Sequence, residues 1–147
     1  GEWKFRLVSD SLPWGTNLDA ADLDGDGHAD LVGTLGHGTG VWWFKGPAYQ
    51  PIPIDETLQY PHCLVVADFD GDRRPDVFTC AYGSRQAVFF WNMGAGRWER
   101  RVLDEDQCAY DAKAVDLNQD GRLDILVAGQ YSSNVVVYLQ SEPDKCL

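Results

Sequence analysis

Three acidic stretches of nine residues recur along the chain: Asp22-Leu-Asp24-Gly-Asp26-Gly-His28-Ala-Asp30, Asp68-Phe-Asp70-Gly-Asp72-Arg-Arg74-Pro-Asp76 and Asp116-Leu-Asn118-Gln-Asp120-Gly-Arg122-Leu-Asp124. Their first aspartates lie 46 and 48 residues apart. A near-constant period of this length is typical of repeat architectures. The stretches therefore bear on the fold as well as on a ligand.

Each stretch has the composition of a calcium-binding loop. Calcium takes six to eight oxygen ligands, and positions 1, 3, 5 and 9 place side-chain oxygens around one turn. Position 7 would contribute a backbone carbonyl, so a basic side chain is tolerated there. We expect about three calcium ions in all, held by the following residues: Asp22, Asp24, Asp26, His28 and Asp30; Asp68, Asp70, Asp72, Arg74 and Asp76; Asp116, Asn118, Asp120, Arg122 and Asp124.

Two alternatives to such sites were weighed. Turns rich in Asp and Gly can exist without a metal, but clustered carboxylates would then repel one another. An EF-hand needs a bidentate Glu at position 12 between two helices. Position 12 is Gly33, Thr79 or Val127, and the flanking segments are short apolar runs that favour strands. Because Asn118 carries no charge, the third loop is expected to bind calcium most weakly.

Length and charge restrict the remaining possibilities. The 147 residues are expected to form a single unit spanning 1–147, and the net charge is −11. The three loops contain eleven of the acidic residues, so bound calcium would offset much of this charge. No basic patch favours nucleic acid, and no run approaches the roughly 18 apolar residues of a membrane span.

Four cysteines, at positions 63, 80, 108 and 146, allow three disulfide pairings. Cys63 and Cys80 flank the second acidic loop and would lie opposite each other in a hairpin, which favours that pair. Free buried thiols remain the alternative. An even number of cysteines together with calcium loops favours a secreted, extracellular protein.

Short apolar segments recur around each loop. One strand precedes the loop and another follows it directly. A third is expected nineteen residues after each first aspartate, at 41–44, 87–90 and 135–138. A fourth ends twelve or thirteen residues before each loop, at 3–10, 52–55 and 98–104. Short strands at regular spacing with Gly-rich turns predict an all-β array.

Four strands per repeat correspond to a blade of a β-propeller. The chain would then be a propeller segment of three four-stranded blades. The N-terminal strand has no blade of its own, and the last repeat stops after its third strand. We expect the N-terminal strand to complete a C-terminal blade, that of a partner chain. Propellers have about four to eight blades, so a homodimer would close a six-bladed ring. The rival hypothesis is a fragment of a larger propeller.

The loop pattern Asp-x-Asp-x-Asp-Gly-x-x-Asp between strands resembles the FG-GAP/VCBS repeats of the integrin α-chain propeller and of many secreted microbial proteins. The resemblance covers essentially the whole chain. The second loop departs from the pattern at Arg73 and the third at Asn118. The resemblance implies calcium loops that tie strands together rather than catalyse. It leaves function open among adhesion proteins, lectins and carbohydrate-active enzymes.

Ligands of propellers bind near the central channel or between blades. Polar and aromatic residues at strand entrances and loops are the candidates, because exposed aromatic rings can stack on the apolar face of a sugar. Four of the polar residues near the channel, including Lys113, could instead support acid–base chemistry, or could simply line the channel. The candidate ligand-binding residues are Trp14, Asn17, Tyr60, His62, Trp91, Tyr110 and Asp111.

Three functions remain open at this point. The first is a non-enzymatic, secreted, calcium-stabilised binding module, lectin-like or adhesive, with carbohydrate or an extracellular protein as ligand. The second is a carbohydrate-active enzyme of the lyase or dehydratase type, or a subunit of one. The third is a filament subunit, built by head-to-tail strand exchange that does not close into a ring.

Overall fold

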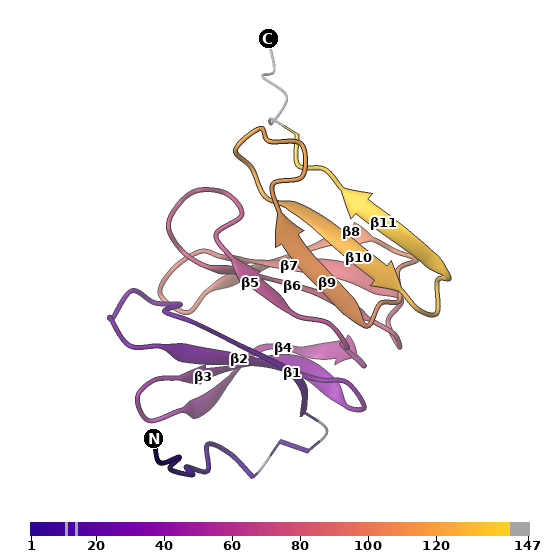
Figure 1. Ribbon diagram of the computed structural model, residues 1–147. Coiled ribbons are helices and arrows are strands. Elements are labelled where there is room, and N and C mark those ends of the chain that lie inside the picture. The colour runs from indigo at the N-terminus through magenta and orange to yellow at the C-terminus, as the bar shows by residue number, and fades with distance from the viewer. Residues whose placement is uncertain (11, 14, 142–147) are drawn as a thin grey trace.

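The described part of the chain contains eleven antiparallel strands in three sheets (Figure 1). The computed structural model describes residues 1–10, 12–13 and 15–141. The first sheet contains β1 (Gly15–Ala21), β2 (Asp30–Leu35), β3 (Thr39–Lys45) and β4 (Gln50–Gln59). The second contains β5 (Val65–Ala67), β6 (Asp76–Ala81), β7 (Gln86–Asn92) and β8 (Trp98–Asp104). The third contains β9 (Asp111–Val115), β10 (Asp124–Gly129) and β11 (Asn134–Tyr138).

Each sheet is a meander in which consecutive strands pair. The first strands of the sheets are neighbours, because β1 contacts β5 and β5 contacts β9. The sheets therefore spread from their first strands like a fan, with the first and third sheets on either side of the second (Figure 1). The all-β prediction is confirmed, and no helix among the described residues could span a membrane. Closure of the sheets into a ring stays a prediction.

The sequence period places most strands correctly. The predicted fourth strand at 98–104 coincides with β8, and the residues described after β11, up to position 141, form no further strand. The fourth strand predicted at 52–55 is longer in the structure, because β4 continues past two register shifts against β3. Residues 3–10, predicted as an outer strand, form no strand within this single chain.

Side chains from neighbouring sheets form two apolar cores. One lies between the first and second sheets and includes Val32, Trp43 and Phe90. The other lies between the second and third sheets and includes Phe78 and Ile125. All six residues of β6 are buried, since both faces of the middle sheet are covered. A strand buried on both faces reads as a continuous apolar run rather than as an alternating one.

The expected neighbourhood of Cys63 and Cys80 is confirmed, but the disulfide is not. Both residues are free buried thiols, and Cys63 Sγ accepts a hydrogen bond from the backbone amide of Cys80 at 3.0 Å. The Cys63 sulfur is thus engaged by the neighbouring backbone. Cys108 is also free and buried, and Cys146 lies outside the described residues.

Candidate functional sites

The first aspartate of each acidic loop organises the turn. Asp22 accepts hydrogen bonds from the amides of Gly25 and Asp26 through Oδ1 and from Gly27 through Oδ2, at 2.8–3.1 Å. The equivalent carboxylates of Asp68 and Asp116 each accept two backbone amides of their own loops at 2.8–3.0 Å. The turns are therefore closed by carboxylate–amide bonds, and their curvature is built into the loop itself.

The ninth residue of each loop is a fully buried aspartate. Asp30, Asp76 and Asp124 each accept one amide from loop position 2, at 3.0–3.1 Å. Each also accepts the amide of the residue that follows the third strand or ends it, at 2.7–2.9 Å. A buried carboxylate is tolerated only when it is hydrogen-bonded. These three aspartates therefore fasten the acidic loop to the third strand of the same sheet.

Two of the loops gather three carboxylates each. Ligand oxygens of Asp22, Asp24 and Asp30 lie within 4.8 Å of one another, as do those of Asp68, Asp70 and Asp76 (loop 2). Three converging carboxylates suit a hard cation that prefers oxygen. Among the residues the structure describes, the third loop has no such group, because Asn118 stands where the other loops have Asp24 and Asp70. That the third loop binds calcium most weakly stays a prediction.

Basic side chains form ion pairs with carboxylates in each of the three loops. Lys45, at the end of β3, forms ion pairs with Asp24 and with Asp26. Its hydrogen bond lowers the pKa of Asp24 below the ordinary value. Position 7 of the second and third loops also supplies a cation, since Arg74 pairs with Asp72 and Arg122 pairs with Asp120.

The position-7 arginines have a second contact that connects loop to strand. Arg74 Nε donates to the carbonyl of Asn92 at 2.7 Å, and Arg122 Nε donates to that of Gln140 at 3.2 Å. These side-chain contacts were missed by the sequence analysis, which assigned position 7 only a backbone carbonyl ligand. They leave that backbone role untested and give the arginine side chains a structural role.

Burial has a different effect in loop 2. Burial, with a smaller contribution from the nearby carboxylates of Asp70 and Asp72, raises the pKa of Asp76 to about 6 against the lowering effect of two backbone hydrogen bonds. A cation bound beside the buried carboxylate of Asp76 would favour its ionised form. The donor set therefore fits a bound divalent cation, which would neutralise the crowded carboxylates.

Two non-glycine residues of the acidic loops, Arg73 and Gln119, adopt a backbone conformation that normally favours glycine. Loop position 6 has φ of 85° at Gly27, 71° at Arg73 and 86° at Gly121. Position 4 has φ of 63° at Gln119 and similar values at the glycines of the other loops. The loops thus keep one shape despite the departures at Arg73 and Gln119, at a cost in strain for the residues with side chains.

An aromatic surface lies at the opposite end of the first strands from the acidic loops. We define it by His37, His62, Tyr82, Tyr110 and Tyr131. The ring of His62 stacks on Tyr110 at 4.2 Å between centroids and meets the edge of His37 at 5.2 Å. Tyr131 continues the series, 5.9 Å from Tyr110 and 4.3 Å from Tyr82. The three tyrosines are 40–52% exposed, so the surface presents ring faces to solvent.

All three sheets contribute to this surface. His37, Tyr82 and Tyr131 come from the turns β2–β3, β6–β7 and β10–β11, whereas His62 and Tyr110 come just before β5 and β9. His62 is buried, and its Nδ1 has no hydrogen-bond partner. Burial, and then the neighbouring His37, lower the pKa of His62, so the imidazole is neutral at pH 7.

Only some of the predicted ligand-binding residues meet here. The side-chain amide of Asn17 donates to the carbonyl of His62, so these two join Tyr110. Tyr60 lies alongside, because its carbonyl accepts the amide of Tyr82. Asp111 is exposed and forms an ion pair with Lys113 at 2.8 Å. Trp14 lies outside the described residues.

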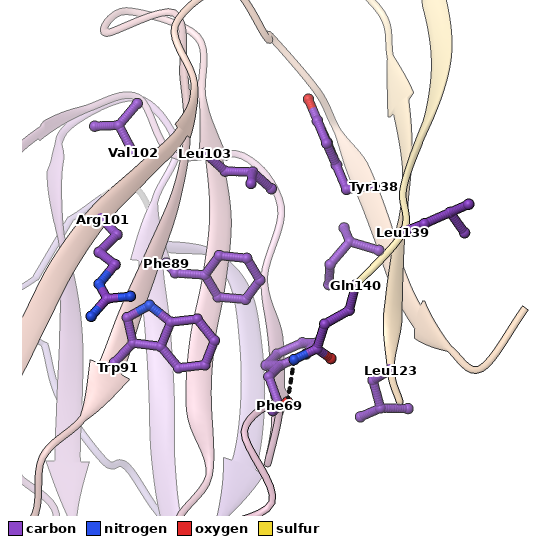
Figure 2. A pocket seen from close by; sticks show the side chains of 11 residues that line it. Phe69, Phe89, Trp91, Arg101, Val102, Leu103, Leu123, Tyr138, Leu139 and Gln140 are labelled. Carbon is purple, nitrogen blue, oxygen red and sulfur yellow. Dashed lines mark hydrogen bonds between the residues drawn. The ribbon is translucent and has the colours of Figure 1, made fainter. Parts of the chain in front are cut away.

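Trp91 lies elsewhere, in a cleft between the second and third sheets (Figure 2). The cleft has a volume of about 280 Å³. Figure 2 shows Phe69, Phe89 and Trp91 on one side and Leu123 and Tyr138 on the other. Trp91 stacks on Phe89 at 4.9 Å, and its Nε1 is buried without a partner.

Sequence reasoning missed His37, Tyr82 and Tyr131. Their common place in the repeat was the available indication, because each lies in or beside the turn between the second and third strands. Equivalent turns of adjacent sheets meet in space, which brings the three side chains together.

An all-β array of repeated meanders with an acidic loop after each first strand defines a class of acidic-loop β-repeat proteins. The chain belongs to the family of FG-GAP-like repeats, whose model matches residues 22–79 and 68–127. These two matches together span the three acidic loops. The comparison with curated proteins finds no match.

Proposed function

We propose that the chain is a secreted, calcium-stabilised binding module with a lectin-like function, and that its ligand surface is the aromatic surface. The observation that carries the proposal is the run of tyrosine rings, contributed by the second and third sheets and 40–52% exposed, at one end of the fan. Ring faces held by neighbouring rings lose little conformational freedom on binding. They suit the apolar face of a sugar ring.

Calcium has a structural part in this proposal. The first strands begin beside the aromatic surface and end at the acidic loops, so the ions would bind at the far end of these strands. Side chains at positions 1, 3, 5 and 9 would supply oxygens, with the third loop weakest. Secretion follows from the calcium loops, because weak calcium sites are filled at the millimolar concentrations found outside cells.

A glycan array tests the proposal directly. We expect binding to a subset of glycans and a loss of about two- to tenfold in affinity for Tyr110→Ala, since stacking of one aromatic ring contributes about 0.5–1.5 kcal/mol. Tyr49→Ala is the matched control, because Tyr49 lies away from this surface, beneath the guanidinium of Arg6. Absence of binding to every glycan, with calcium present and the protein folded, would reject the lectin-like function.

The enzyme alternative rests on one observation, the neutral imidazole of His62. A neutral imidazole can accept a proton at pH 7, and its unpartnered Nδ1 is available in principle. However, Tyr110 stacks on the ring and His62 is only 3% exposed, so a substrate would have to displace Tyr110. Turnover of a glycan substrate that is lost in His62→Gln, with unchanged melting temperature, would favour the enzyme.

A further inference from the structure

Among residues 1–10, 12–13 and 15–141, no strand pairs with the outer edge of β11 in the third sheet. The first and second sheets each end in a fourth strand, β4 and β8, whereas the third ends at β11. Val135 of β11 is 81% exposed, and Leu139, just beyond the strand, is 58% exposed. Unpaired edges with apolar side chains favour pairing with another strand. The outer edge of β11 is therefore available to pair with one more strand.

The second sheet shows what an outer strand contributes. β8 pairs with β7 so that Trp98 lies opposite Asn92 and Arg100 lies opposite Phe90. The indole of Trp98 packs against the core between the first and second sheets, and Arg100 forms an ion pair with Asp55 of the first sheet. Alternate residues of this strand, beginning with Trp98, thus face the preceding sheet.

The second and third sheets are joined in the same way as the first and second. Asn92 donates through Nδ2 to the carbonyl of Leu23 in the loop of the preceding sheet, at 2.7 Å. Gln140, in the same repeat position, donates through Nε2 to the carbonyl of Phe69 at 3.0 Å. The place of Trp98 in the second sheet therefore corresponds to a place beside Gln140 in the third. The cleft of Figure 2, which Gln140 and Tyr138 border, lies at this place.

The N-terminal segment has the side-chain pattern of the missing strand. Trp3-Lys-Phe5-Arg-Leu7 matches Trp98-Glu-Arg-Arg-Val102 in its first tryptophan and in the alternation of its last apolar residue. Trp3 is 100%, Phe5 91% and Leu7 60% exposed. Three large exposed apolar side chains at alternate positions are unusual on a surface unless a partner covers them.

The segment lies beside the first sheet of its own chain, at the opposite end of the fan from β11 (Figure 1). Arg6 holds it there, donating to the carbonyl of Pro47 at 2.9 Å and lying over the ring of Tyr49. To reach its own β11, the segment would have to cross two sheets. A second copy whose third sheet packs next to this first sheet would present β11 directly.

We propose that residues 3–8 of a second copy form the fourth strand of the third sheet, with the Trp3 indole in the cleft between the second and third sheets. By the register of β8, Trp3 lies opposite Gln140, Lys4 opposite Leu139 and Phe5 opposite Tyr138. Trp3, Phe5 and Leu7 face the cleft, and Lys4 and Arg6 face the first sheet of their own chain. The exchange is reciprocal, so two chains close one ring of six sheets.

The exposed end faces of the fan support a second copy as the occupant. Leu18 of β1 is 65% exposed, and Val115, which ends β9, and Leu117 in the loop after it are 38% and 50% exposed. In the middle of the fan the equivalent faces are buried against a neighbouring sheet. Stacking the third sheet of one copy on the first sheet of the other covers both end faces at once. Two half-rings would then expose no apolar sheet face.

Mass in solution and a cross-link test this proposal. We expect wild type to measure as a dimer of the 16.4 kDa chain. Trp3→Ala should raise the dimer dissociation constant by about thirtyfold or more, because the anchor is a buried aromatic and is present twice in each ring. Lys4→Ala is the matched control and should leave the dimer intact. A monomeric wild type, or an unchanged dimer in Trp3→Ala, would overturn the proposal.

A double variant tests the register. Lys4→Cys with Leu139→Cys should yield a covalent dimer on mild oxidation, whereas Lys4→Cys with Val135→Cys should not. A ladder of species larger than the dimer would indicate a filament and would overturn the closed ring. Equal cross-linking of both cysteine pairs would overturn the register. Neither measurement uses a sugar, so the outcome is independent of the lectin-like function.

Discussion

Loop position 6 offers a sharp test of how the acidic loops are built. Arg73 has φ of 71°, close to the 85° and 86° of Gly27 and Gly121 at the same position. Its side chain is exposed, while its amide donates to Asp68 at 2.9 Å, a bond that glycine would keep. Replacement by glycine therefore removes strain and breaks no backbone contact.

The magnitude follows from two opposing effects. A left-handed conformation costs a residue with a side chain about 1–2 kcal/mol. Glycine loses more conformational freedom on folding, which costs about 0.5–1 kcal/mol. We expect Arg73→Gly to stabilise the fold by about 0.5–1 kcal/mol, which raises the melting temperature by about 1–4 °C for a chain of this length.

The reverse change provides the matched control. A methyl group added at Gly27 would meet no atom within 4 Å, so Gly27→Ala introduces the backbone strain and no clash. It should lower the melting temperature by a similar amount. Arg73→Gln keeps the strain and removes the charge, and so separates the two effects.

Thermal unfolding followed by circular dichroism, with calcium and with chelator, is the assay. Arg73→Gly should gain more with calcium present, because it also removes a positive charge near the ion. If Arg73→Gly lowers the melting temperature while Gly27→Ala leaves it unchanged, the argument from backbone strain is wrong.

Three further predictions concern a hydrogen bond between sheets, the protonation of Asp76 and the packing around Gly36. Asn92→Ala should destabilise the fold by about 2–3 kcal/mol in urea unfolding, because it leaves the carbonyl of Leu23 without its donor. Burial raises the pKa of Asp76 from 3.8 to about 6, so the folded chain binds a proton between about pH 4 and 6 that the unfolded chain does not. In chelator, the free energy of unfolding should therefore fall by up to about 3 kcal/mol as pH rises through that window. Calcium binds the ionised carboxylate and should reverse the trend. If the difference in unfolding free energy between wild type and Asp76→Asn does not change with pH, this expectation is wrong. Gly36→Ala should be destabilising and should disturb the histidine resonances in NMR spectra, since the added methyl would lie 2.8 Å from Nδ1 of His62; unchanged spectra would contradict the packing.

Chelation tests the loops as a group. Three carboxylates within 4.8 Å repel one another without a cation. We expect removal of calcium to lower the melting temperature, with most of the effect from the first two loops. Calorimetry should therefore detect two stronger sites and one weaker or absent site. An identical melting temperature with and without chelator would make the loops plain turns.

The local patterns of the sequence determined the strands and loops. A strand of four to seven residues needs only an apolar run between turns, and the acidic loop needs only its own carboxylates and amides, as the bonds of Asp22 show. The partners of Asp30, Asp76 and Asp124, at the end of the third strand or just beyond it, were not predicted, because each lies sixteen residues from its aspartate in the sequence.

Contacts between sheets could not be obtained from the period alone. The repeat places His37, Tyr82 and Tyr131 in similar turns, but only packing of three sheets brings their rings together. The same holds for the thiols of Cys63 and Cys80, which were correctly expected to be neighbours and wrongly expected to be bonded. Sulfur geometry depends on the exact path of two strands, which spacing does not specify.

The sequence by itself determined that this chain is an array of repeated antiparallel strands with an acidic loop in each repeat. These are properties of order along the chain, fixed by local hydrogen bonding and apolar periodicity. The tertiary structure alone decided where the unfilled space lies: a cleft beside β11, bordered by Tyr138 and Gln140. The position of a cavity depends on how side chains of different sheets pack against one another, and therefore on how the sheets themselves are arranged.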